Sequence, residues 1–411
     1  MKKMKIVVIG AGNRAGAYTQ YALKYPEQAE VVAVAEPMER ARESFKTMHS
    51  LPDEMCFNSY EELLAKPKMA DYAFICTQDK MHFEPSIMAL NAGYNLLLEK
   101  PIAPTAEECL EIARVAKEKS LNVTVCHVLR YAKMYKKIKE IEDSGVLGDI
   151  VELHLRENVG NYHMSHSFVR GNWHKEADSN PMIIAKCCHD LDLIRWLMGM
   201  RPEKISSFGS LTYFNEAHAP EGSPKRCTDG CPEAATCRYY APRVYLETAR
   251  WCSDVVFPEH TDAEILEKLS TDSPYGICVY HNDNDVVDHQ TVSIRFSNGA
   301  IADLTMTPFR YEGNRETIIA GTNAELRADT DIERITVTEY MSGNKTFYDT
   351  SVSGNHFGGD MGLMADLVAA WRNGDTPSSV IDASIDSHLM AWAAEDSRHT
   401  GKTVDFEDYL K

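Results

Sequence analysis

The first third of the chain alternates short apolar runs with stretches of helical periodicity. Apolar runs at 5–9, 31–35, 72–76, 95–98 and 123–126 predict strands. Helical patterns lie between them, up to about residue 25 and at 38–48, 83–91 and 106–119. Strands that alternate with helices predict a parallel sheet with helices on both faces, as in a Rossmann domain.

Beyond about residue 130 the pattern changes to strands with polar and apolar alternation. Strands are expected at 151–158, 291–296, 300–306, 316–320 and 335–340, with a hairpin turn at 297–299, which fits a mostly antiparallel sheet. Helices are expected at 134–143, 361–372 and 385–398, the last two forming a C-terminal pair at about 360–398 with Asp360 as a cap. The length of 411 residues favours two domains, which we assign to 1–128 and 129–411.

Composition and charge narrow the classes of partner. The net charge of -18 argues against nucleic acids and anionic membrane surfaces as partners, since both attract basic patches. Apolar runs fall short of a bilayer span, and the N-terminus lacks the pattern of a signal peptide. Eleven cysteines without a secretion signal suggest a reducing cytoplasm rather than a disulfide framework.

A glycine-rich turn follows the first strand. Gly10 allows a tight turn, Gly12 lets a pyrophosphate approach the backbone, and Ala15 permits close packing of the helix that opens with Asn13 and Arg14. Glu36 ends the second strand, where a carboxylate binds ribose hydroxyls and repels a 2′-phosphate, so NAD is favoured over NADP. The alternative is a glycine turn in an α/β domain without a nucleotide.

Charged residues also follow the later strands. Glu99 and Lys100 come after the apolar run at 96–98, Thr77 after the strand at 72–76, and His127 after the strand at 123–126. Ligands of open parallel sheets bind beyond these carboxyl ends. A partly desolvated Lys100 could transfer protons there, whereas the alternative is a surface lysine paired with Glu99.

Three groups of residues carry a family resemblance: Gly10-Ala11-Gly12, Thr77 with His82, and Glu99-Lys100-Pro101. They resemble the Gfo/Idh/MocA family of NAD(P)-dependent sugar oxidoreductases, over essentially the whole chain. The resemblance implies a Rossmann domain joined to a C-terminal α/β domain with a large, mostly antiparallel sheet that often forms an oligomer interface, hence a homodimer or homotetramer. It also implies that Lys100 lies beside the substrate hydroxyl and the nicotinamide, with Thr77, His82 and Glu99 near the cofactor.

A second chemical cluster spans 181–197. Leu191, Ile194 and Leu197 have helical spacing, and His189 stands near the helix start, where a neutral imidazole able to accept a proton is favoured. A capping or core histidine is the alternative. By resemblance, His189 with Asp192 matches the family's substrate-domain motif, whose histidine commonly acts as acid or base. The family often has an Asp four positions earlier, but this chain has Ala185 followed by Lys186, which suggests a second active-site lysine.

Polar and aromatic side chains gather at 162–173, a composition that suits a sugar: polar groups for hydroxyls and an indole for a ring face. A polar surface loop is the alternative. The substrate residues we expect are Arg130, Tyr131, His163, His166, Arg170, Trp173 and Asp192.

A cysteine-rich insert lies at about 222–260. Cys227, Cys231 and Cys237 are compatible with a structural zinc, while three reduced thiols are an equal alternative. The fourth ligand stays open among Cys252, His218 and His260. An iron–sulfur cluster ranks lower, as does a catalytic metal held by Cys188 and His189 with His163 or His166.

Three functions remain open. The first is NAD-dependent oxidation of a secondary hydroxyl of a sugar, sugar derivative or glycoside, with Lys100, His189 and Lys186 as catalytic groups. The second is a redox-neutral glycoside hydrolase with tightly bound NAD, which works by transient oxidation, elimination, hydration and reduction. The third is an NAD or sugar sensor without turnover.

Overall fold

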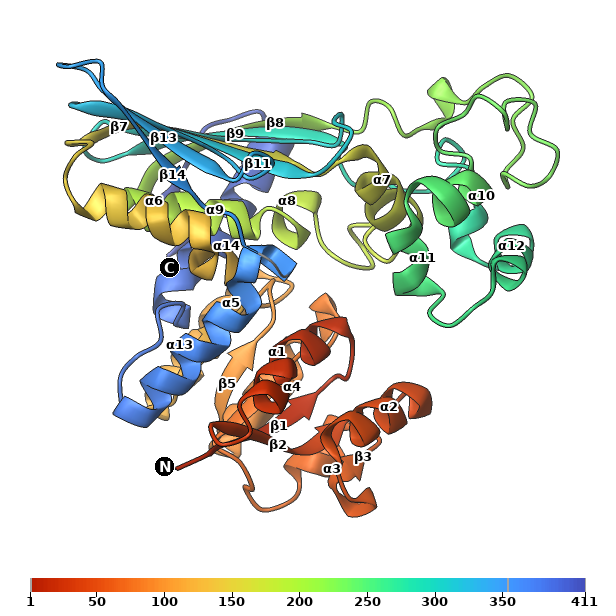
Figure 1. The fold of residues 1–411 in the computed structure, drawn as a ribbon, viewed down its shortest axis with the longest axis horizontal. Coiled ribbons are helices and arrows are strands. Elements are labelled where there is room, and N and C mark those ends of the chain that lie inside the picture. Colours follow the sequence, from red (N-terminus) through yellow and green to blue (C-terminus); the bar gives the residue numbers. More distant parts are fainter. Residues whose placement is uncertain (1, 353–354, 411) are drawn as a thin grey trace.

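The computed structural model describes residues 2–352 and 355–410 and contains two sheets, one in each lobe of Figure 1. The lower sheet has six parallel strands in the order β3-β2-β1-β4-β5-β6, the arrangement expected of a Rossmann domain. Its strands are β1 (Met4–Ile9), β2 (Ala29–Ala35), β3 (Cys56–Phe57), β4 (Tyr72–Ile75), β5 (Asn95–Leu98) and β6 (Val123–Val125). Its helices are α1 (Asn13–Lys24), α2 (Glu39–His49), α3 (Tyr60–Leu64), α4 (Phe83–Asn91) and α5 (Ala106–Glu118). The predicted alternation is confirmed.

Residues of the lower strands are buried on both faces, as a parallel sheet requires. In β1, Val7 and Ile9 pack into the core that holds α4 and α5, whereas Ile6 and Val8 pack into the core that holds α1. Because successive side chains of a strand point to opposite faces, one apolar run serves both cores.

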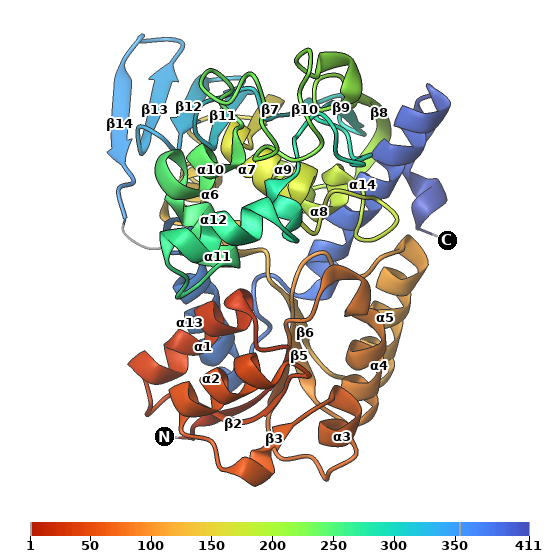
Figure 2. The ribbon, with the colours of Figure 1, turned by 90° about the vertical axis from the view of Figure 1, so that its right-hand side faces the viewer.

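The second core of the lower lobe is completed by a helix from the end of the chain. Leu363, Met364 and Leu367 of α13 (Gly359–Asn373) pack with the β1 and α1 residues, and α13 lies beside α1 in Figures 1 and 2. The C-terminal helix pair is thus confirmed, and its first helix belongs spatially to the nucleotide-binding lobe.

The upper sheet has nine strands in the order β14-β13-β12-β11-β7-β10-β9-β8-β15, seen as a row in Figure 2. Its pairings in the described chain are antiparallel except for β7 with β10, so the mostly antiparallel sheet is confirmed. The strands are β7 (Ile150–Asn158), β8 (Pro202–Ser210), β9 (His289–Phe296), β10 (Ile301–Thr307), β11 (Asn314–Gly321), β12 (Ala324–Asp329), β13 (Arg334–Glu339), β14 (Lys345–Asp349) and β15 (Val404–Asp405).

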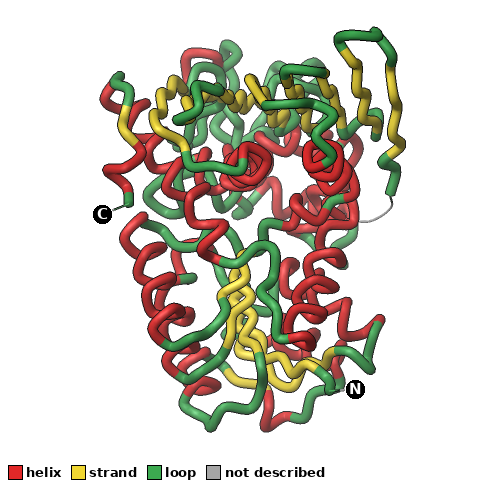
Figure 3. Tube along the Cα trace, turned by 90° about the vertical axis from the view of Figure 1, so that its left-hand side faces the viewer, coloured by secondary structure: helices red, strands yellow, loops and turns green. Residues whose placement is uncertain are grey.

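Helices lie between this sheet and the lower lobe, as Figure 3 shows. They are α6 (Lys133–Asp143), α8 (Met182–Ala185), α9 (Cys188–Met198) and α14 (Ile381–Thr400). Helix α14 contacts α9, β8 and also α5 of the lower lobe, so it links the two domains. The opposite face of the sheet points away from the first domain.

A long insert joins β8 to β9 and forms the right-hand end of Figure 1. It holds the short helices α10 (Ala241–Arg243), α11 (Arg250–Val256) and α12 (Asp262–Ser270), and it lies against α7 (Asn161–His163) and the π-helical segment Met164–Arg170. A second π-helical segment, Val244–Thr248, lies within it. Short 3-10 turns occur at Asp53–Met55, Asp79–Met81, Val128–Tyr131, Glu216–His218, Pro274–Gly276, Asn355–Gly358 and Phe406–Tyr409.

Two expectations need correction. Asp360 does not cap its helix: Gly358 takes the cap position with a left-handed backbone, φ +80°, and Asp360 lies in the first turn. The expected strands omitted β3, β8, β12, β14 and β15, whose sequences are short or polar. Among the described residues, no helix combines the length and apolar character needed to cross a membrane.

Candidate active site

The glycine turn after β1 has the shape of a dinucleotide cradle. Gly10 has φ +89°, and a Cβ there would lie 2.7 Å from the carbonyl oxygen of Cys76, so only glycine fits. A Cβ at Gly12 would meet no atom within 4 Å, which leaves open space above the start of α1. Helix α1 has no side-chain cap and no acidic residue in its first turn, so its first amides suit a phosphate.

Glu36 ties this turn to the end of β2. Its Oε2 accepts a hydrogen bond of 2.8 Å from the amide of Ala11, and its Oε1 accepts one of 2.9 Å from the amide of Met38. The carboxylate therefore stands beside the glycine turn, where it can meet a ribose. Gly10, Gly12, Asn13 and Glu36 together fit NAD and would hold its pyrophosphate and adenosine ribose.

Arg14 lies in a buried charge network rather than reaching out from α1. Its Nε donates to Glu99 Oε1 at 2.8 Å, and its Nη2 donates to Asp360 Oδ1 at 2.7 Å. The hydroxyl of Tyr18 also donates to Glu99. Although burial opposes the carboxylate form of Glu99, Arg14 and Lys100 lower its pKa. The network fixes the residue that precedes Lys100.

Lys100 lines a cleft of about 280 Å³ between the two domains. Its Nζ donates a hydrogen bond of 2.9 Å to the carbonyl oxygen of Ala185, at the end of α8. The ammonium thus meets the segment that leads to His189. The cleft is lined by Arg14, Thr77, Gln78, Asp79, Lys80, Met81, Glu99, Lys100, Asn172, Trp173, Asp178 and Ser179.

His82 connects the loop that follows β4 to the loop that follows β5. Its Nδ1 lies 2.6 Å from the carbonyl oxygen of Pro101, and its Nε2 lies 3.1 Å from that of Thr77. The buried ring therefore holds the loop after β4 against the loop after β5. We call residues 10–14, 36–38, 77–82 and 99–101 the nucleotide edge.

Three imidazoles meet behind Lys100. The ring of His127 lies 5.7 Å from that of His189 and 5.5 Å from that of His388. Burial, with help from Arg130 and Lys100, lowers the pKa of His127, and burial beside His127 lowers the pKa of His388 to about 3. Nε2 of His388 accepts from the amide of Ile102 at 2.9 Å. The imidazoles of His127 and His388 are therefore uncharged near neutral pH.

The predicted substrate residues Arg130, Tyr131 and Asp192 lie buried at the junction of the domains. Arg130 makes two hydrogen bonds to Asp192, of 2.7 and 2.6 Å. The hydroxyl of Tyr131 donates to Asp366 at 2.9 Å. These contacts occupy polar groups that a sugar would need, and they instead connect α9 and α13 to the segment after β6.

Lys186 belongs to a second buried network, whose other members the sequence pattern did not reveal. Its Nζ lies 3.4 Å from Glu157 Oε1, and Nη2 of Arg315 lies 2.7 Å from Glu157 Oε2. Nε of Arg315 donates to Asp190 at 2.7 Å. Burial raises the pKa of Asp190, against the opposing influence of Arg315. One sequence signal could have indicated these residues. It is a charged side chain at a position of a strand where the alternation predicts an inward-facing apolar one, as at Glu157 in β7.

His163 and His166 lie on neighbouring turns against the insert. Burial has the largest effect on the pKa of His163 and lowers it. The nearby cation Lys186 lowers it further, and Lys100 does so more weakly. The ring of His166 stacks on Tyr275 at 5.0 Å, and its Nδ1 lies 3.0 Å from the hydroxyl of Tyr245. We call Glu157, His163, His166, Lys186 and Arg315 the opposing wall, after the domain that carries them; none of the five is among the residues that line the cleft at Lys100.

Trp173 and Arg170 have different surroundings. Trp173 lines the cleft, and its Nε1 donates to Asp79 at 3.1 Å, which brings the loop after the π-helical segment onto the nucleotide edge. Arg170 is 1% exposed and donates to the carbonyl oxygens of Ile277 and Tyr239. These bonds favour a structural role for Arg170 in place of contact with a sugar.

No metal geometry is preformed in the part of the chain that the structure describes: its His, Cys, Asp and Glu side chains, as they stand, form no group of three or more around a point where an ion would fit. Cys188, His189, His163 and His166, considered for a catalytic metal, form no such group as their side chains stand.

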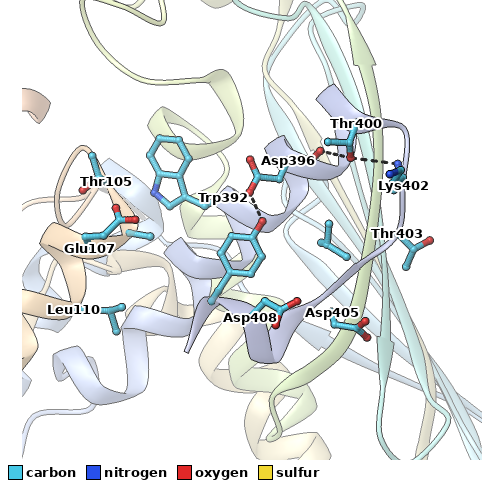
Figure 4. A pocket seen from close by; sticks show the side chains of 13 residues that line it. Thr105, Glu107, Leu110, Trp392, Asp396, Thr400, Lys402, Thr403, Asp405 and Asp408 are labelled. Carbon is cyan, nitrogen blue, oxygen red and sulfur yellow. Dashed lines mark hydrogen bonds between the residues drawn. The ribbon is translucent and has the colours of Figure 1, made fainter. Parts of the chain in front are cut away.

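Larger pockets lie away from this chemistry. One of about 800 Å³ is formed by α14, the start of α5 and the C-terminal segment, where Figure 4 shows Trp392, Asp396 and Thr400 around it. It shares no lining residue with the cleft at Lys100. The cleft at Lys100 is the candidate site because the nucleotide edge opens into it.

Comparisons with known proteins agree with this geometry. Residues 4–127 match the description "Oxidoreductase family, NAD-binding Rossmann fold", and residues 139–406 match "Oxidoreductase family, C-terminal alpha/beta domain". The chain is 24% identical to a putative oxidoreductase of Bacillus subtilis, YteT, over 79% of this chain and 78% of that protein. It is 25% identical to 2,7-anhydro-N-acetylneuraminate hydratase of Escherichia coli over 50% of this chain and 52% of that protein.

A solved structure shares the fold over nearly the whole chain. Levoglucosan dehydrogenase, in complex with NADH and levoglucosan, superposes with a TM-score of 0.74 at 14% identity, covering 98% of this chain and 100% of that one. The two family matches together span most of the sequence, and from them one conclusion follows: the chain belongs to the Gfo/Idh/MocA family of NAD-binding oxidoreductases.

Proposed function

We propose that this protein oxidises a secondary hydroxyl of a sugar or sugar derivative with NAD. The observation that carries the proposal is the meeting of Lys100, at the end of β5, with the segment Ala185–His189 of the other domain, through the 2.9 Å bond from Nζ to the Ala185 carbonyl. Lys100 lines a cleft that the nucleotide edge opens into, and Trp173 lines the same cleft from the other domain.

Each residue has a role in this proposal. NAD, when bound, takes up the hydride from the carbinol carbon. Lys100 and His189 orient the hydroxyl and take its proton, directly or through one another. Trp173 offers an apolar surface to the sugar ring, and Asp79 fixes its indole. The Glu36 carboxylate favours NAD over NADP.

A second candidate is redox-neutral cleavage or hydration of a glycoside, supported by the opposing wall. Burial lowers the pKa of His163, and the nearby cations Lys186 and, more weakly, Lys100 lower it further. A simple dehydrogenase needs one acid or base, whereas elimination also needs a base for the acidified C–H and an acid for the leaving group. The hydratase among the relatives agrees with this second reaction class.

The experiment that tests both candidates is a screen of sugars and nitrophenyl glycosides. NADH formation and aglycone release are read together, with catalytic NAD in one arm and excess NAD in the other. A dehydrogenase accumulates NADH in step with substrate, whereas redox-neutral cleavage releases phenol without net NADH. Tight binding of NAD and sugar without either signal would overturn both candidates and leave a sensor.

We also propose a homo-oligomer joined through the open face of the upper sheet. Phe208 is 74% exposed, Phe347 60% and Ile301 45%, and their strand partners place them on the outward face. Exposed aromatic side chains on a flat sheet favour pairing with another copy. Light scattering should give a dimer or tetramer mass, and Phe208→Asp should lower it; a monomer mass for the wild-type protein would contradict this.

A further inference from the structure

Four cysteines from two distant segments line one small, closed cavity in the insert. Cys227, Cys231, Cys237 and Cys278 surround a free volume of about 10 Å³, which has room for a single water or ion. Tyr239, Tyr240 and Tyr280 complete the aromatic part of the lining. The cysteines of the described chain form no disulfide.

The backbone fixes the first and last of these cysteines as neighbours. The amide of Cys227 donates to the carbonyl of Gly276 at 3.0 Å, and the amide of Cys278 donates to that of Lys225 at 2.9 Å. An antiparallel bridge pairs Arg226 with Ile277 between them. A Cβ at Gly276 would lie 1.9 Å from the carbonyl oxygen of Leu269, so a glycine is needed for this close approach.

The other two cysteines lie on consecutive turns. The amide of Ala234 donates to the carbonyl of Cys231 at 3.2 Å, and the amide of Cys237 donates to that of Glu233 at 2.8 Å. The segment therefore winds back on itself and returns Cys237 to the cavity that Cys231 also lines. Cysteine thiolates brought to one place by the fold are the ligands that structural zinc sites use.

A buried cation stands beside the cluster. Nη2 of Arg170 lies 3.6 Å from Sγ of Cys227, and Arg170 is 1% exposed. Four thiolates around a divalent ion carry a net negative charge, which a guanidinium at this distance offsets. Sulfur ligands without oxygen select zinc over magnesium or calcium.

We propose that Cys227, Cys231, Cys237 and Cys278 bind one structural zinc ion. The sulfurs do not surround a common point as the side chains stand, so binding turns them about the Cα–Cβ bonds while the backbone positions stay. Cys278 takes the fourth place, because Cys252, His218 and His260 do not line this cavity. Each thiol loses its proton to solvent as it coordinates.

The ion would fix the part of the opposing wall that carries His163 and His166. Arg170 ends the π-helical segment that carries His166, and its bonds to the carbonyls of Ile277 and Tyr239 join that segment to the cysteine cluster. The insert also supplies Trp251, whose ring lies 5.6 Å from those of both His163 and His166. A folded insert is therefore needed to position these histidines.

The test measures zinc in the whole protein, which distinguishes it from any test of catalysis. Protein produced with zinc in the medium should contain about one ion per chain by elemental mass spectrometry. Cys278→Ser should lose most of it, whereas Cys252→Ser, a buried cysteine of the same insert outside the cavity, should keep it.

Cobalt gives a second readout that does not depend on a variant. Wild-type protein produced with Co²⁺ should show the sulfur-to-cobalt charge-transfer and d–d bands of a tetrahedral four-thiolate site. The proposal is overturned if wild-type protein holds no stoichiometric zinc and its four thiols react with a disulfide reagent in the native state. A disulfide joining Cys227 to Cys278, or unchanged zinc in Cys278→Ser, would overturn it as well.

Discussion

The nucleotide edge and the opposing wall are built in different ways. The nucleotide edge consists of short loops, each directly after a strand of one parallel sheet, and neighbouring residues in sequence act together, as Glu99 and Lys100 do. The opposing wall brings together Glu157 of β7, His163 of α7, His166 of the π-helical segment, Lys186 at the end of α8 and Arg315 of β11. The first region therefore consists of motifs that a sequence displays, and the second exists only once the chain is folded.

This difference carries a functional lesson. The nucleotide edge fixes what all members of such a fold must do, which is to hold a dinucleotide next to a proton-transfer group. The opposing wall is supported by its own buried charge network, in which Lys186 and Arg315 both lie against Glu157. Variants in the two regions should therefore fail in different ways.

The largest effect is expected from Lys100→Met on the nucleotide edge. Loss of the ammonium should lower turnover about 10³-fold, since a positioned acid–base group typically contributes 10²–10⁴-fold. NAD affinity, measured by quenching of protein fluorescence, should change little. Unchanged turnover in this variant would remove the role of Lys100.

A smaller and more selective effect is expected from Lys186→Met on the opposing wall. If elimination is part of the reaction, glycoside cleavage should fall about 10²-fold while NADH formation from a simple sugar falls much less. The two rates are measured on the same preparation. The matched control is Lys175→Met, which removes a lysine paired with Asp283 on the surface. Equal losses in both rates would assign Lys186 to binding or stability instead.

Alanine substitutions at Gly10 and Gly12 should have different effects: the first on the stability of the fold, the second on the binding of NAD. Gly10→Ala should destabilise the fold by about 2 kcal/mol, because its Cβ would lie 2.7 Å from the Cys76 carbonyl oxygen at φ +89°. Gly12→Ala should fold normally and lose NAD affinity about tenfold, since its methyl meets no protein atom but occupies the approach of the pyrophosphate. Thermal unfolding and NAD titration of both variants check the pair; equal behaviour would contradict it.

A dependence of stability on pH is expected at the junction of the two domains. Burial lowers the pKa of His388 to about 3, below its ordinary value of about 6.5. Between these values the unfolded chain binds a proton that the folded chain does not, so stability rises with pH and falls on acidification, by about 1.4 kcal/mol per pH unit for this group. The free energy of unfolding, measured with urea at several pH values in this range, should depend less steeply on pH in His388→Asn than in the wild-type protein. The difference in slope should correspond to about one proton. An unchanged slope would mean that His388 does not remain neutral in the folded state.

The sequence could predict the elements whose pattern is local. The strands β1, β2, β4, β5 and β6 are apolar runs between clear turn signals, and the glycine turn and the Glu99-Lys100-Pro101 motif lie directly after two of them. Strand β14 could not be found, because it is exposed on both faces and has no alternation of burial. Strand β8 contains Pro202, Gly209 and three serines, which obscure its inward side.

The opposing wall could be predicted only in part. His163, His166 and Lys186 stood out as polar groups in one region, but Glu157 and Arg315 are far apart in sequence and meet only through the pairing of β7 with β11. Arg130 and Arg170 drew attention as cations near the site, and their partners Asp192, Ile277 and Tyr239 became visible only in three dimensions. A local sequence pattern does not show which residues far apart in the chain come into contact.

The return of α13 to the lower lobe has a consequence for biosynthesis. The strands of the nucleotide-binding lobe are translated first, yet one apolar flank stays bare until Leu363, Met364 and Leu367 have left the ribosome. Asp360, the partner of Arg14, arrives with them. The domain that is synthesised first is thus the last to complete its fold. Chains that stop before this helix would expose an apolar surface that chaperones bind.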